Sequence, residues 1–139
     1  MQDQLERSWI DEGFQLWPSA GPFLASVGSF YFKEQIGGTA FRLRLGEDHC
    51  NGIRLVHGGL LATLADSWLA INVAHGLPKG SKFVTSSLGI DYLASTVPGQ
   101  VLELEVGRIK HGRRICFASG TLIASGKAVA ATRVTFVLL

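Results

Sequence analysis

The sequence has few of the residues that build metal centres, disulfide frameworks or nucleic-acid surfaces. It contains only two cysteines, Cys50 and Cys116, which lie far apart and form no CxxC pair. We therefore expect neither a metal site nor a disulfide, and interpret both as small buried hydrophobes or free thiols. With a net charge of only +2 and no basic stripe, we expect no nucleic-acid partner. Four prolines against seventeen glycines indicate many turns and no proline-rich linker.

Charge of either sign is also scarce, since charged residues make up 17% of the chain and hydrophobic residues 47%. A chain of 139 residues with this balance is typical of one packed domain and not of a disordered segment. We therefore expect a single domain over residues 1–139. The mean hydropathy of +0.26 nevertheless raises the question of a membrane segment.

The longest apolar stretch, residues 58–74, does not meet the requirements of a membrane helix. It is just short of the ~20 residues that span a bilayer, and Asp66 lies in its middle. Residues 1–14 mix both signs of charge and lack the basic-then-apolar order of a signal peptide. We expect a soluble, cytoplasmic protein without membrane insertion, whose surplus apolar surface is buried between the subunits of a homo-oligomer.

Hydrophobic periodicity divides the chain into short elements. Residues 2–13 predict an amphipathic helix, and residues 23–33 and 41–45 predict two strands that form a hairpin. A long helix is predicted from Gly58 to about residue 75, because its apolar side chains repeat every three to four positions. Four further strands, joined by glycine-containing turns short enough for antiparallel hairpins, are predicted over residues 83–93, 101–109, 115–124 and 128–138.

The predicted long helix has almost no polar face, so it needs apolar surroundings on nearly every side. A curved antiparallel sheet wrapped around this one central helix supplies such surroundings. The sequence therefore predicts an α+β fold built from one sheet and one long central helix.

Asp66 is the most unusual residue of this helix. Its neighbours are apolar, and no lysine or arginine lies one turn away. One interpretation is an aspartate that bonds a nearby hydroxyl or tilts to solvent. The start of the helix favours a functional interpretation, because Gly58 and Gly59 after His57 allow a ligand to approach closely. The first free N–H groups of a helix carry partial positive charge, which suits a developing oxyanion.

Gly58 and Asp66 cannot reach the same carbonyl group from a single helix. They are eight residues apart, which corresponds to ~12 Å along a helix axis. Two antiparallel copies of the helix, related by a two-fold axis, bring Gly58 of one subunit opposite Asp66 of the other. A catalytic site built from these residues is therefore expected at a dimer interface.

Asn51, the His57-Gly58-Gly59 turn and Asp66, in this spacing, resemble the hotdog-fold acyl-CoA thioesterases, particularly the phenylacetate-degradation thioesterase-like branch. The order of hairpin, buried helix and strand meander extends the resemblance over nearly the whole chain. It implies that Asp66 acts as a general base on water or as a nucleophile, while the Gly58 N–H polarises the thioester carbonyl. It also implies that His57 supports the turn and that Asn51 holds the carboxylate or the lytic water.

Family members that use aspartate often have a hydroxyl on the first strand after the helix, where this chain has Thr85 with Ser86 beside it. Members that use glutamate often carry serine or threonine one turn beyond it, and this chain has Ala70 there. The resemblance therefore fits the aspartate subgroup better and leaves the placement of water to Asn51 and Thr85. Gly59 and Ser86 are assigned to substrate binding.

Basic residues gather around the predicted turn at His111-Gly112. One interpretation is a solvated hairpin tip, and the other is a binding site for the phosphates of coenzyme A. The residues assigned to the phosphates are Lys110, Arg113 and Arg114. For the acyl group, an apolar lining expected from Leu60, Leu61, Trp68 and the strand at Phe83 favours an aryl or medium-chain substrate. The alternative for Trp68 is an ordinary core residue.

The leading hypothesis is a thioesterase that hydrolyses an acyl-CoA, or an acyl-carrier thioester, to free acid and thiol. It requires no cofactor, because coenzyme A enters as part of the substrate, and its expected form is a dimer or a dimer of dimers. Two alternatives stay open on the same fold. One is a non-catalytic acyl-CoA binder or sensor, and the other is a hydratase of acyl thioesters.

Overall fold

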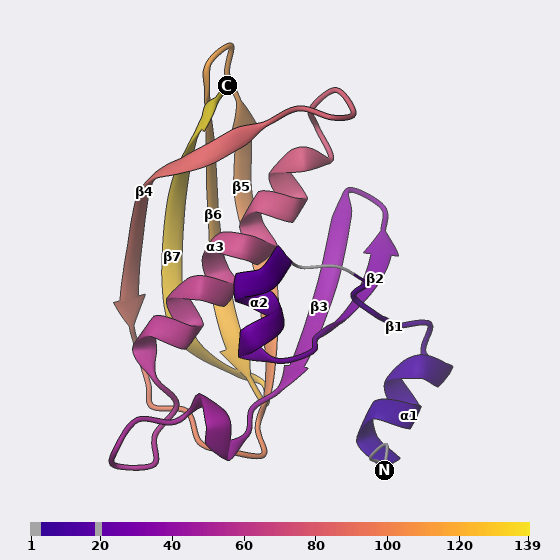
Figure 1. The fold of residues 1–139 in the computed structure, drawn as a ribbon, viewed down its shortest axis with the longest axis vertical. Helices are drawn as coiled ribbons and strands as arrows, with labels where there is room; N and C mark the ends of the chain where they lie inside the picture. The colour runs from indigo at the N-terminus through magenta and orange to yellow at the C-terminus, as the bar shows by residue number, and fades with distance from the viewer. Residues whose placement is uncertain (1–3, 19–20) are drawn as a thin grey trace.

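The computed structural model describes residues 4–18 and 21–139. A seven-stranded antiparallel sheet curves around one long helix, α3 (Gly58–Ala74), as Figure 1 shows. The strands are β1 (Gln15–Leu16), β2 (Tyr31–Gln35), β3 (Gly38–Arg44), β4 (Phe83–Tyr92), β5 (Val101–His111), β6 (Ile115–Ala124) and β7 (Lys127–Leu138). Their order across the sheet is β1-β2-β3-β5-β6-β7-β4. The predicted α+β class, with one sheet around one central helix, is confirmed.

Helix α3 is held by the apolar face of the sheet. Its Trp68 is fully buried and stacks on Phe41 of β3, with ring centroids 5.1 Å apart and planes 3° from parallel. Leu64, Ala65 and Leu69 of the same helix are also fully buried. The opposite stripe of α3 is only half-buried and carries Asp66.

Among the helices of residues 4–18 and 21–139, none has the length and apolar character of a membrane span.

Helix α1 (Gln4–Asp11) lies on the outer side of the β2–β3 hairpin. Trp9 packs edge-on against Tyr31, and Phe14 joins them in a small separate core. The guanidinium of Arg42 lies 4.3 Å from the Phe14 ring centroid and bonds Glu12 at 2.8 Å. The predicted N-terminal helix is confirmed from Gln4 to Asp11 but ends two residues earlier than predicted, and residues 2–3 of that prediction lie outside the described residues.

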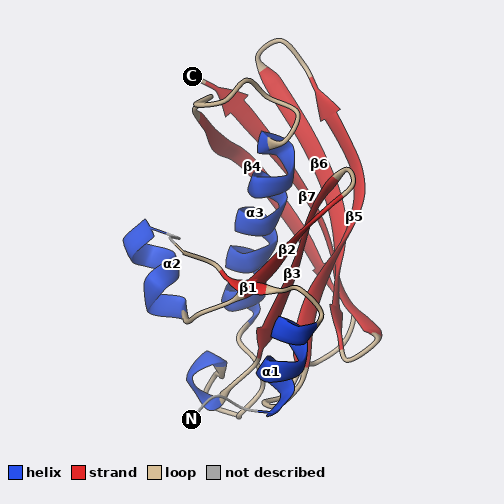
Figure 2. Cartoon of the chain, turned by 90° about the vertical axis from the view of Figure 1, so that its right-hand side faces the viewer, coloured by secondary structure: helices blue, strands red, loops and turns tan. Residues whose placement is uncertain are grey.

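The predicted strand over residues 23–33 is wrong in its first half. Gly21–Val27 forms helix α2, and strand structure begins only at Tyr31. Pro22 suits the first turn of a helix, and Gly28, with φ of 125°, ends it. Leu24 and Val27, three residues apart, pack against the main core from this short helix. Figure 2 shows α2 on the side of α3 that faces away from the strands.

The predicted β2–β3 hairpin is confirmed, as are the hairpins between β5, β6 and β7. The predicted hairpin between residues 83–93 and 101–109 is wrong, because β4 pairs with β7 at the far edge of the sheet. The chain after Tyr92 crosses beneath the start of α3 instead. The N–H of Leu93 donates to Val129, and Thr96 accepts from the N–H of Val56. These bonds fix the connection as it runs from β4, at the edge of the sheet, to β5, which lies between β3 and β6.

Replacement of Trp68 tests how far the sheet depends on this one side chain. Trp68→Ala should lower the free energy of unfolding by ~3–5 kcal/mol, because it leaves a cavity between α3 and Phe41. Trp68→Phe should cost much less, since the buried Trp68 Nε1–H has no hydrogen-bond partner among the described residues. Denaturant unfolding measures both, with Ile36→Ala at the exposed hairpin tip as the control. Equal losses for the two Trp68 variants would contradict this account.

Candidate functional site

Asp66 is held by a hydroxyl from the sheet. Thr85 of β4 donates its hydroxyl hydrogen to Asp66 Oδ1 over 2.6 Å. Thr85 points toward α3 because its pair across the sheet, Phe136, is a core residue of the same face. One carboxylate oxygen is therefore fixed, and a charged acceptor makes this a strong hydrogen bond. No other hydrogen bond to this carboxylate occurs within the part of the chain that the structure describes.

A cleft of about 410 Å³ opens beside this carboxylate. We call it the carboxylate cleft, and its lining comes from α2, α3, β4, β7 and the turn before α2. The lining residues are Trp17, Leu24, Asp66, Ser67, Ala70, Ile71, Phe83, Val84, Thr85 and Phe136. Most of these side chains are apolar, so the cleft combines one carboxylate with a hydrophobic wall. This combination suits an acyl group whose polar end lies at Asp66.

His57 caps the start of α3. Its Nδ1 accepts the N–H of Gly59 over 2.8 Å, which fixes this nitrogen as the unprotonated one. Gly58 has a different neighbour, because Tyr92 of β4 donates its hydroxyl to the Gly58 carbonyl over 2.6 Å. A β-carbon on Gly58 would lie 3.0 Å from the Tyr92 ring, so only glycine fits without displacing it. Within the described residues, the Gly58 N–H has no acceptor and stays available to a ligand.

Asn51 organises the loop that leads into α3. Its Oδ1 accepts the N–H groups of Ile53 and Leu55, both over 3.1 Å. Arg54 in this loop has φ of 62° and bonds Glu47 at 2.6 Å, and this hydrogen bond raises the pKa of its guanidinium.

Asn51 and Gly58 also border a second cleft, of about 330 Å³, which we call the helix-start cleft. Its other lining residues are Leu55, Val56, Leu61, Tyr92, Leu93, Ala94, Ser95 and Thr96.

The structure thus divides the predicted site residues into two groups on one chain. Asp66 and Thr85 meet in the carboxylate cleft, while Asn51 and Gly58 meet in the helix-start cleft. Gly58 and Asp66 are eight positions apart on α3, which corresponds to ~12 Å along the helix axis. Among residues 4–18 and 21–139, no group of His, Cys, Asp and Glu side chains is placed to hold a metal ion.

The remaining predicted residues lie elsewhere. Ser86 sits at a β-bulge, where its hydroxyl donates to the Thr135 carbonyl over 3.2 Å. Lys110, Arg113 and Arg114 are exposed at the β5–β6 hairpin tip. The tip lies at the C-terminal end of α3, at the far end of the helix from Gly58 (Figure 1).

The predicted acyl lining is partly wrong. Trp68 is fully buried in the core, and Leu61 borders the helix-start cleft, while Phe83 does line the carboxylate cleft. Leu60 lies outside both clefts and lines a separate hollow near His57.

Trp17, Leu24 and Tyr92 border the clefts although their sequence context did not single them out. Tyr92 alternates with the outward-facing Asp91 on β4, and this alternation is the one signal that places it on the helix side.

Comparison with known proteins identifies the family. The family model of the thioesterase superfamily matches residues 54–131. A Pseudomonas aeruginosa protein provisionally named an esterase is 33% identical, over 91% of this chain and 96% of that protein. Human acyl-coenzyme A thioesterase 13 is 30% identical, over 67% of each chain.

Solved structures agree with this assignment. A mutant of the phenylacetic acid degradation protein PaaI from Thermus thermophilus superposes with a TM-score of 0.74 and 25% identity, over 86% of this chain and all of that one. A Bacillus halodurans protein solved with CoA gives a TM-score of 0.66 and 30% identity, over 72% and 66% of the two chains. The chain therefore belongs to the thioesterase superfamily, and is a hotdog-fold thioester hydrolase of the branch that includes the phenylacetic acid degradation proteins.

Proposed function

We propose that this protein hydrolyses an acyl-CoA, with an aryl or medium-chain acyl group favoured, to the free acid and CoA. The observation that carries the proposal is the Asp66 carboxylate, held by Thr85 at the wall of an apolar cleft. CoA as the thiol is supported by the Bacillus halodurans relative, which was solved with CoA. Lys110, Arg113 and Arg114 offer exposed positive charge for its phosphates. A cytoplasmic location belongs to the same proposal.

The complete site requires two copies of the chain. Asp66 of one copy faces Gly58 and Asn51 of the partner subunit, because the two half-sites lie too far apart along one α3. Strand β4 supports this arrangement. It ends the sheet, pairs only with β7 among the described strands, and exposes Val84, Leu88 and Tyr92. A second β4 running antiparallel to the first extends the sheet and covers these side chains.

Two routes use the same groups. In the first, Asp66 takes a proton from a water molecule whose oxygen attacks the thioester carbon, and the Gly58 N–H of the partner subunit stabilises the oxyanion. The tetrahedral intermediate then breaks its C–S bond, and the CoA thiolate takes up the proton. In the second, the Asp66 carboxylate itself attacks, CoA leaves, and water hydrolyses the resulting anhydride. A single turnover in oxygen-18 water tests the second route, because label enters the Asp66 carboxylate only when that carboxylate forms the anhydride and water attacks the aspartyl carbon.

Removal of the Asp66 charge tests the proposed chemistry. Asp66→Asn should lower kcat by about 10²–10⁴-fold, because an amide neither accepts the proton of water nor attacks the carbonyl. Thiol release from a panel of acyl-CoAs measures the loss. Asp91→Asn on β4 is the matched control, since its side chain is 75% exposed and faces away from α3. Turnover that is equal in the Asp66 variant and the wild type would remove Asp66 from the mechanism.

The Thr85 hydroxyl should affect turnover by holding the Asp66 carboxylate in position. Thr85→Val keeps the shape of the side chain but removes the donor to Asp66 Oδ1, so kcat should fall about tenfold or more. Thr85→Ser keeps the donor and should stay within about threefold of wild type. Steady-state kinetics of both variants on one acyl-CoA decides the point. Equal loss in the valine and serine variants would show that the hydroxyl does not act on Asp66.

Mixed dimers test whether the site is shared between subunits. Asp66→Asn and Asn51→Ala chains, each weakly active alone, should regain activity when their subunits exchange. Half of the dimers are then mixed and contain one intact site of two, so about a quarter of the wild-type activity should return. Differently tagged chains report the extent of exchange. If exchange is complete and activity stays at the level of the parent variants, each site lies within one chain.

A further inference from the structure

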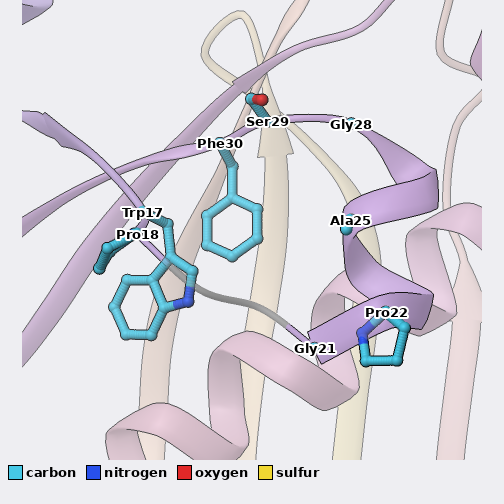
Figure 3. A pocket seen from close by; sticks show the side chains of 8 residues that line it. All are labelled: Trp17, Pro18, Gly21, Pro22, Ala25, Gly28, Ser29 and Phe30. Atoms are coloured by element: carbon cyan, nitrogen blue, oxygen red, sulfur yellow. The ribbon is translucent and has the colours of Figure 1, made fainter.

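Trp17 lies between two cavities. On one side it lines the carboxylate cleft of about 410 Å³. On the other side it lines a cavity of about 500 Å³ between Pro18, α2 and the residues just before β2, which Figure 3 shows. We call this the outer cavity. Its other lining residues are Pro18, Gly21, Pro22, Ala25, Gly28, Ser29 and Phe30. Trp17 is the one lining residue that the two cavities have in common.

The indole of Trp17 is fixed by its neighbours. It stacks on Phe30 with ring centroids 5.8 Å apart, and Phe32 and Phe41 meet it edge-on at 4.9 Å and 5.9 Å. Its backbone N–H donates to the Phe30 carbonyl over 2.9 Å. Aromatic contacts of this geometry hold a ring in one orientation. Trp17 is therefore a fixed wall of the carboxylate cleft.

Helix α2 continues this wall. Leu24 lines the carboxylate cleft, while Pro22 and Ala25 of the same helix line the outer cavity. Phe23 lines neither of these two and is 67% exposed. Figure 2 places α2 over the side of α3 that faces away from most of the sheet. Leu24 of α2 and Asp66 of α3 line the same cleft. Trp17 and α2 together separate the two cavities.

The wall is built from a part of the chain that precedes the matched family region. The family model covers residues 54–131, which include Asp66 and Thr85 but not Trp17 or Leu24. An acyl group whose carbonyl lies at Asp66 fills the apolar remainder of the cleft and meets these two side chains. The catalytic part and the wall that limits the acyl group thus come from different segments.

We propose that Trp17, together with Leu24, determines the longest acyl chain that this protein accepts. The proposal rests on the proposed thioesterase function. Beyond the indole lies the outer cavity, so removal of the ring joins the two spaces into one. Each further methylene that becomes buried should then favour the substrate about fourfold.

The test compares wild type with Trp17→Ala on saturated acyl-CoAs from butanoyl to palmitoyl. In the variant, the ratio of kcat/KM for palmitoyl-CoA to that for octanoyl-CoA should rise at least about tenfold. Trp17→Phe keeps a ring in the wall and should stay close to wild type. Circular dichroism and Tm establish that each variant is folded. An unchanged ratio in folded Trp17→Ala would overturn the proposal.

A second pair of variants leaves the Trp17 aromatic contacts intact. Leu24→Trp fills the cleft from the side of α2, so the preferred acyl chain should become shorter. Phe23→Ala on the same helix is the control and should leave the preference unchanged, because Phe23 lines neither cavity. A folded Leu24→Trp variant with the wild-type chain-length profile would overturn the proposal even if Trp17→Ala does not fold.

Binding of CoA thioethers separates this proposal from the proposed function. S-alkyl-CoA thioethers cannot be hydrolysed, so calorimetric titration measures the preferred alkyl length without catalysis. A shift to longer alkyl chains in Trp17→Ala supports the wall even if wild type hydrolyses no acyl-CoA, in which case only the thioesterase function fails. Hydrolysis by wild type with identical thioether preferences in both proteins overturns the wall and leaves the thioesterase function standing.

Discussion

The whole structure depends on burying a helix that has no polar face of its own. The sheet curves around α3 because Trp68, Leu64 and Leu69 must all leave water, and stacking of Trp68 on Phe41 fixes the helix against β3. Only one stripe of α3 escapes this burial, and Asp66 lies on it. The apolar character of the helix therefore determines which of its positions can meet a substrate.

The same constraint explains why the candidate catalytic groups are spread along the helix. A helix rigidly embedded in a sheet cannot bend to bring its start next to its middle. Gly58 and Asp66 are consequently fixed in position, each with its own partner on β4: Tyr92 for the glycine and Thr85 for the aspartate. Strand β4 therefore contacts both Gly58 and Asp66 at the separation that α3 sets. It holds each of the two residues in a defined orientation.

Local patterns were sufficient to predict most of the fold. Helix α3 and its start at Gly58 were predicted correctly because the apolar residues repeat every three to four positions over seventeen residues, which is long enough to distinguish a helix from a strand. Helix α2 was missed because its seven residues are too short to show a period, and Phe23 and Val27 favour strands when read alone. The pairing of β4 with β7 was also missed. The residues Pro98-Gly99 indicate a turn between β4 and β5, but they do not show which distant strand pairs with β4.

The candidate site shows the same division. Asp66 and the turn at Gly58 could be found in sequence because each contrasts with its surroundings, whereas Thr85 was assigned only through the family resemblance. The wall formed by Trp17 could not, because a tryptophan beside a proline-rich turn looks the same whether it faces solvent or a cleft. Its position becomes visible only in the packing against Phe30, which precedes β2, and Phe41 of β3.

The position of β4 at the end of the sheet has a consequence for solubility. A terminal strand presents backbone N–H and C=O groups that any other extended chain can bind, which is the usual starting point of aggregation. On β4 this exposed ladder is accompanied by Val84 and Leu88, so nothing charged discourages an unwanted partner at these positions. Pairing with a second β4 closes the ladder. The subunit association that we propose for the active site would also remove the surface from which fibres could grow.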